Sequence, residues 1–145
     1  MIKKLTRIFM MVIVLMLFAT LPVSAGSKTT GGSVAGVPVW AEKGLNYGSG
    51  TFSAYVWSHA ASSIGTIGYR WWTVREYCPV YGTYPVNLQY GGEVNYGSDS
   101  KYTSLNTYSY SCPNNSAKQF QNLGTHDFKQ GTSEYTPQVD LYENR

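Results

Sequence analysis

In the stretch TFSAYVWS, residues 51–58, the apolar residues Phe52, Ala54 and Val56 occupy every second position, and the large rings Tyr55 and Trp57 lie at the positions between and after them. Successive side chains of a β-strand point to opposite faces, so Phe52 and Val56 are predicted to face one way and Tyr55 and Trp57 the other. One face then suits a hydrophobic core, while the opposite face carries large rings. The pattern predicts a half-buried strand and favours an all-β fold.

A second aromatic stretch, TIGYRWWTVREYC at residues 66–78, follows the connecting segment HAASSIG. With a period of two, Tyr69 and Trp71 share one face, and Trp72 and Val74 share the opposite face. Because both faces carry aromatic area, we expect a central or covered strand.

The rest of the chain is rich in Tyr, Thr, Val, Gly, Asn and Ser, which favour strands and turns. Gly91-Gly92 separates two short alternating runs and predicts a tight β-hairpin. Only residues 116–123 suggest a helical turn or two. We expect about seven antiparallel strands forming one small β-sandwich over residues 37–145, preceded by a flexible tail over residues 26–36. Further strands are expected at 37–42, 101–112, 124–131 and 139–144.

The N-terminus has the pattern of a secretory signal peptide. Lys3, Lys4 and Arg7 precede an apolar run that is short for a membrane span, and Val23-Ser24-Ala25 supplies small residues for a signal peptidase. We predict cleavage after Ala25; the alternative is an uncleaved anchor. The mature protein is therefore expected to be secreted, without stable membrane association.

Charge limits the partners. The formal charge of +3 arises from eleven basic and eight acidic residues, and three of the basic ones lie in the leader. The mature chain would carry eight of each and has no run of Lys or Arg. Because phosphate groups and anionic lipids are bound by clustered positive charge, we expect neither nucleic acid nor an anionic membrane surface as a partner.

The two cysteines, Cys78 and Cys112, are each followed by proline. Two cysteines in one small secreted domain usually pair, so we predict a disulfide. Each ends a predicted strand, where the following proline fits because it cannot donate to a ladder. The stretch EYCPVYGTYP, residues 76–85, would then anchor the loop that holds Tyr81 and Tyr84.

Catalytic and metal-binding patterns are weak. His126 is followed by Asp127, but in a strand the two side chains would point to opposite faces. Glu76 is the most suggestive acid, with local pairing to Arg75 or Arg70 as the alternative. The sequence has no metal-ligand spacing and no nucleophile elbow. We expect no enzymatic activity, no cofactor and no metal, and keep a small hydrolase using Glu76 or His126 as an alternative.

The distinctive surplus is aromatic: 13 Tyr and four Trp, all after the leader. Exposed on a sheet, such rings stack on sugars or partner surfaces at low entropic cost. The predicted contact residues are Trp57, Trp72, Tyr81 and Tyr84.

Residues 44–62, GLNYGSGTFSAYVWSHAAS, resemble the secreted bacteriocins of the lactococcin 972 type. Tyr47-Gly48, Trp57-Ser58 and His59 occupy places similar to those of a Tyr-Gly turn and a Trp-Ser-His step in that family. The resemblance implies a small secreted β-sandwich with antimicrobial activity. Two expectations for function follow: binding of an extracellular glycan, cell-wall polymer or protein through exposed aromatics, or a bacteriocin-like activity.

Overall fold

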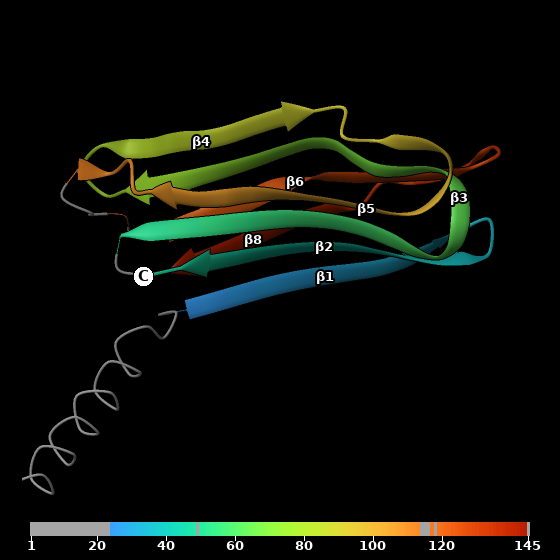
Figure 1. Cartoon of the computed structure of the whole chain (residues 1–145), viewed down its shortest axis with the longest axis horizontal. Helices are drawn as coiled ribbons and strands as arrows, with labels where there is room; N and C mark the ends of the chain where they lie inside the picture. The colour runs from blue at the N-terminus through green and yellow to red at the C-terminus, as the bar shows by residue number, and fades with distance from the viewer. Residues whose placement is uncertain (1–23, 49, 114–116, 118, 145) are drawn as a thin grey trace, which may run out of the picture.

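The computed structural model describes residues 24–48, 50–113, 117 and 119–144 of the chain. These residues form an antiparallel, all-β structure without an α-helix (Figure 1). The all-β prediction is confirmed, with eight strands in place of about seven. The strands are β1 (Ser24–Val34), β2 (Val37–Tyr47), β3 (Thr51–Cys78), β4 (Gly82–Tyr90), β5 (Val94–Ser109), β6 (Gln119–Gln130), β7 (Ser133–Tyr135) and β8 (Gln138–Asn144).

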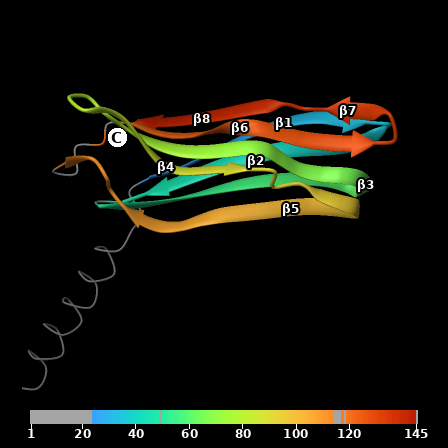
Figure 2. The ribbon, with the colours of Figure 1, turned by 90° about the horizontal axis from the view of Figure 1, so that it is seen from above.

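Strand β3 organises the molecule. The two aromatic stretches and the segment between them form one 28-residue strand, which bends over at one end of the molecule (Figure 1). Its first half pairs with β2 and β5, and its second half pairs with β4 and β6. All eight strands therefore belong to one sheet, which folds over on itself at this bend (Figure 2). We call β1, β2, β5 and the first half of β3 the first layer, and the second half of β3 with β4, β6, β7 and β8 the second layer.

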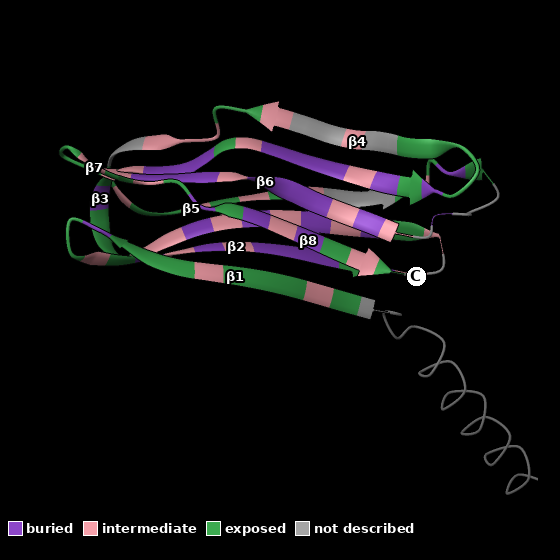
Figure 3. Ribbon diagram, turned by 180° about the vertical axis from the view of Figure 1, so that it is seen from behind, coloured by how far each residue is buried: buried purple, intermediate pink, exposed green. Residues whose placement is uncertain are grey.

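Residues 26–36, predicted to be a flexible tail, form most of the edge strand β1 and the turn that follows it. β1 pairs with β2 from Ser24↔Tyr47 to Val34↔Val37. The two-residue turn between them, Ala35-Gly36, has positive φ at both positions, 48° and 80°, the geometry that suits a β-hairpin. Backbone pairing thus orders a segment whose side chains are mostly exposed (Figure 3).

The predicted hairpin at Gly91-Gly92 is wrong. β4 and β5 pair with different halves of β3 and not with each other. The Gly91 amide donates to the carbonyl of Arg70, and the Tyr69 amide donates to the carbonyl of Gly92. The two glycines therefore carry the chain from one layer to the other along β3, where a side chain on Gly92 would meet the Tyr69 ring.

Two further expectations changed. A bulge between Tyr69 and Trp71 interrupts the alternation of β3, so Tyr69 faces the same core as Trp72. The helical turn expected at residues 116–123 is not found at 119–123, which begin β6; residues 116 and 118 lie outside the described part. Tertiary pairing with β3 and β8 decides this segment.

The interior has two hydrophobic clusters separated by a polar belt, defined here as Lys43, Ser58 and His126. One cluster gathers around Phe52, Trp72 and Phe120, and the other around Val39, Ile67 and Phe128. All three belt residues are fully buried. Figure 3 shows buried residues along β2, β3 and β6, whereas β1 is mostly exposed.

The predicted signal peptide lies outside the described residues, except for Ser24 and Ala25. No helix in the described ranges has the length and apolar character needed to cross a membrane.

Candidate functional site: an aromatic sheet face

The outward face of the first layer carries five aromatic side chains on three neighbouring strands. Alternation in the first half of β3 turns Phe52, Ala54 and Val56 into the core and leaves Tyr55 and Trp57 on the outward face, as predicted. Pairing with β2 and β5 brings more rings beside them. We call this surface the aromatic face: Trp40, Tyr55, Trp57, His59 and Tyr102.

Three of these rings form a stack. His59 lies opposite Trp40 across the β2–β3 ladder, with ring centroids 5.1 Å apart and planes within 19°. Trp57, two residues earlier on β3, stacks on His59 with centroids 4.2 Å apart. Burial lowers the pKa of His59 below its ordinary value, and Glu42 opposes this shift. The lowered pKa favours the neutral imidazole in this stack of three rings.

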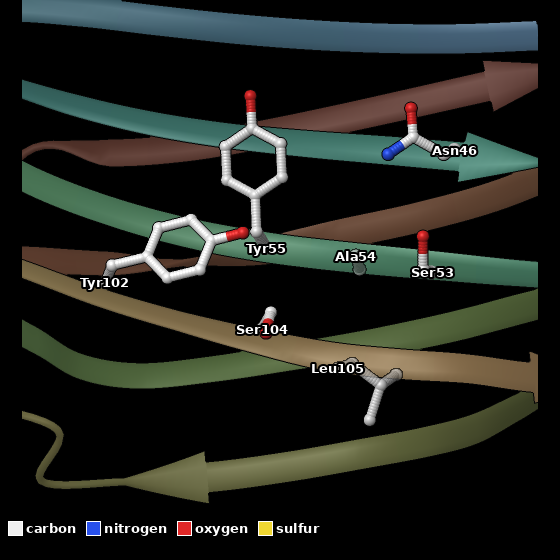
Figure 4. A pocket seen from close by; sticks show the side chains of 7 residues that line it. All are labelled: Asn46, Ser53, Ala54, Tyr55, Tyr102, Ser104 and Leu105. Carbon is white, nitrogen blue, oxygen red and sulfur yellow. The ribbon is translucent and has the colours of Figure 1, made fainter.

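Tyr55 lies beside this stack and points across β2 (Figure 4). Its ring covers Gly44, where any Cβ would collide with it. The hydroxyl donates to Glu42 Oε1 at 2.6 Å. Burial and the bond to Glu42 raise the pKa of Tyr55, so it stays a donor. Glycine at position 44 is what lets the ring lie flat and reach Glu42.

A hollow of about 470 Å³ opens next to Tyr55, and Figure 4 shows its lining side chains. Tyr55 and Tyr102 form an aromatic wall, with ring centroids 5.7 Å apart. Asn46, Ser53 and Ser104 contribute an amide and two hydroxyls. Rings beside uncharged donors and acceptors are suited to a ligand with an apolar face and a hydroxylated edge.

The predicted contact residues separate in the structure. Trp57 lies half-buried on the aromatic face. Trp72 does not face outward: it is fully buried, and its Nε1 donates to Asn122 Oδ1 at 2.7 Å. Its prediction as a contact residue is corrected, because β3 turns this residue into the core.

Tyr81 is 55% exposed in the turn after β3. Tyr84 pairs through its backbone with Glu76, while its side chain lies outside the described part. Val80 and Tyr81 are the exposed apolar side chains of this turn, which follows the opposite end of β3 from the half that holds Trp57.

Cys78 and Cys112 are joined, with Cα atoms 5.9 Å apart. Glu76 lies against this disulfide and makes the one grouping with metal-ligand spacing in the described ranges. Both sulfurs are already bonded to each other, so the grouping lacks thiolate ligands. Instead, Glu76 Oε2 accepts hydrogen bonds from the amides of Ser111 and Cys112.

The two residues considered for hydrolysis are interior. Glu76 is fully buried and bonded to backbone amides, not to Arg70 or Arg75. His126 is fully buried, with Nδ1 2.8 Å from Ser58 Oγ, so it is not a surface-loop residue. Neither side chain reaches solvent in this structure.

Of the five residues of the aromatic face, the sequence predicted only Trp57 as a contact residue. The other four, Trp40, Tyr55, His59 and Tyr102, were not predicted to gather around it. The alternation of Tyr55, Trp57 and His59 was a usable signal for one strand. That alternation does not predict the register of β2 and β5, which brings Trp40 and Tyr102 beside these residues. Comparison of the chain with protein-family models and with curated proteins finds no match.

Proposed function

We propose that this chain is a secreted, non-enzymatic β-sandwich domain that binds an extracellular polysaccharide through the aromatic face. The single observation that carries the proposal is the gathering of the Trp40–His59–Trp57 stack beside a hollow lined by tyrosines, serines and an asparagine. Pyranose rings have apolar faces that pack on such rings and hydroxyls that bond to such polar groups.

The length of the face supports a polymer as the ligand. Ser53 and His59 delimit six residue steps of β3, which span on the order of 20 Å at the usual rise per residue. The hollow lies at one end of this stretch and the ring stack at the other. A linear glycan is long enough to contact both parts at once.

The outer face formed by β6 and β8 differs from the aromatic face, and this difference supports the aromatic face as the binding surface. There β6 and β8 expose amides that bond mainly to one another, Gln119 to Asn144 and Gln121 to Gln119. These amides are engaged with one another, and Tyr142 is the exposed ring beside them, without a ring stack like that of the aromatic face among the described residues. Secretion is supported by the leader sequence and by the disulfide, since such bonds persist in oxidising compartments.

The test is a sedimentation assay of the mature protein with insoluble cell-wall material, cellulose and chitin. We expect the protein in the pellet with at least one of them, and Trp57→Ala to shift it to the supernatant. Tyr142→Ala is the matched control, because Tyr142 is 50% exposed on β8, in the other layer. Wild-type protein that stays in the supernatant with every polymer contradicts the proposal.

A bacteriocin-like activity is the second candidate. Two residues that carry the resemblance, Trp57 and His59, lie on the aromatic face, where a target would contact them. Inhibition of bacterial growth by the purified protein, lost in Trp57→Ala, would favour it over a purely adhesive role.

A further inference from the structure

A carboxylate lies within the aromatic face. Glu42 is on β2 opposite Trp57 of β3, between the ring stack and Tyr55. One of its oxygens, Oε1, accepts the Tyr55 hydroxyl hydrogen bond. The residue is half-buried, and the bond to Tyr55 engages one of its two carboxylate oxygens.

Within the part of the chain that the structure describes, no Lys, Arg or His forms an ion pair with this carboxylate. The ion pairs among the described side chains involve Asp127 and Glu134, and none involves Glu42. The neighbouring Lys43 is turned into the interior and fully buried. His59 is the nearest titratable base on the face, and burial keeps it neutral by lowering its pKa. Glu42 therefore brings an uncompensated negative charge to the face.

Like the carboxylate of Glu42, the surrounding aromatic rings favour a positively charged ligand group. The faces of Trp and Tyr carry negative electrostatic potential and attract cations. A carboxylate flanked by Tyr55 and Trp57 disfavours anionic polymers and favours a positively charged group. The hollow supplies Asn46, Ser53 and Ser104 as partners for hydroxyl groups alongside it.

We propose that the polysaccharide bound by this face carries protonated amines, as in a polymer of glucosamine units, with an ammonium group placed between Glu42 and the rings. This inference rests on the proposed function and specifies its ligand. The hydroxyl-binding groups of the hollow favour an amino sugar over a lysine side chain of a partner protein, because a lysine would leave them unused.

Titration calorimetry with soluble oligosaccharides of glucosamine, N-acetylglucosamine and glucose tests the inference on the mature protein. We expect the glucosamine oligomer to bind most tightly and Glu42→Gln to weaken it about tenfold, as for loss of a charge-assisted contact. Binding of the glucose oligomer should weaken much less in this variant than binding of the glucosamine oligomer, because the introduced glutamine can still accept the Tyr55 hydrogen bond and only the charge is lost. Raising the salt concentration should weaken only the glucosamine oligomer.

Glu143→Gln is the matched control, because it removes the same charge from β8 in the other layer. Equal binding of the three oligomers, unaffected by Glu42→Gln, overturns the amine inference while leaving glycan binding intact. Binding of none of them, together with failure to sediment with any polymer, overturns the proposed function itself. A lysine-rich peptide that binds more tightly than the glucosamine oligomer also overturns the inference and assigns the face to a protein.

Discussion

The Oγ atom of Ser58 lies 2.8 Å from Nδ1 of His126, in the interior between the two layers. Ser58 also donates its single hydroxyl hydrogen to the carbonyl of Gly68 at 2.6 Å. Nδ1 of His126 must then carry the hydrogen that joins the pair, which leaves Nε2 as a bare lone pair. That atom is buried without a hydrogen-bond partner in the described structure, and burial together with Lys43 lowers the pKa of His126 to about 3.

Lys43 of the polar belt makes stability depend on pH. Burial lowers its pKa from 10.5 to about 7, with Asp140 opposing, and its Nζ has no hydrogen-bond partner among the described residues. Between pH 7 and 10.5 the unfolded chain binds more protons, so the free energy of unfolding should rise with pH, by up to about 5 kcal/mol. Lys43→Met should therefore be more stable than wild type at pH 7, with the difference shrinking towards pH 10 in urea titrations. A constant difference across this range would contradict the assignment.

Glu76 fixes the segment that leads into Cys112. Replacing it with alanine removes the acceptor of two backbone hydrogen bonds and leaves the amides of Ser111 and Cys112 unsatisfied. We expect a loss of about 2–4 kcal/mol in the free energy of unfolding. Glu134→Ala, an exposed acid, is the control and should cost under about 1 kcal/mol. Equal effects would show that the Glu76 bonds do not stabilise the fold.

The Cys78–Cys112 disulfide closes a loop with a sequence separation of 34. Its loss in the double Cys→Ser variant should lower the free energy of unfolding by about 3–4 kcal/mol in the chain-entropy treatment. Thiol titration of the denatured, unreduced protein should detect no free thiol. Two titratable thiols in the secreted protein would refute the pairing.

Replacement by phenylalanine should reduce mainly stability at Trp72 and mainly glycan binding at Trp57. Trp72→Phe leaves a cavity and removes the donor to Asn122 Oδ1, so we expect about 2–4 kcal/mol of destabilisation and unchanged glycan binding. Trp57→Phe should cost under about 1 kcal/mol in stability and weaken binding. Thermal unfolding and sedimentation with polysaccharide measure the two effects separately. Loss of binding in folded Trp72→Phe would place this residue in the site after all.

Gly44 controls the position of Tyr55. A methyl group at this position would occupy the place of the Tyr55 ring, so Gly44→Ala should displace the ring and break its bond to Glu42. We expect weaker glycan binding and about 1–3 kcal/mol of destabilisation. Gly48→Ala is the control, because a Cβ added at this position would come no closer than 4.0 Å to its nearest neighbour, the Thr51 carbonyl oxygen. Identical binding by the two variants would mean that the ring position is unimportant.

The alternation of residues 51–58 was sufficient to predict a strand with the correct buried and exposed sides. The disulfide was also predictable, because two cysteines in a small oxidised domain have one intramolecular pairing. The same rule of alternation failed after Tyr69, since a bulge inserts one residue without a mark that period-two reasoning detects. The sequence also did not distinguish the buried Trp72 from the outward Trp57. Both are tryptophans in strand patterns, and the side-chain type does not indicate which face of a sheet is covered.

The sequence by itself determined the strand-forming composition, the crosslink and the aromatic surplus, which are properties of residues and their near neighbours. The tertiary structure alone decided the layers, because the bend in β3 and its pairing with β2, β4, β5 and β6 depend on contacts between distant residues. Those contacts bring Trp40 to His59, Tyr55 to Glu42 and Tyr102 to Tyr55. The aromatic face exists because backbone hydrogen bonding fixes the register of three strands, which no single stretch of sequence encodes.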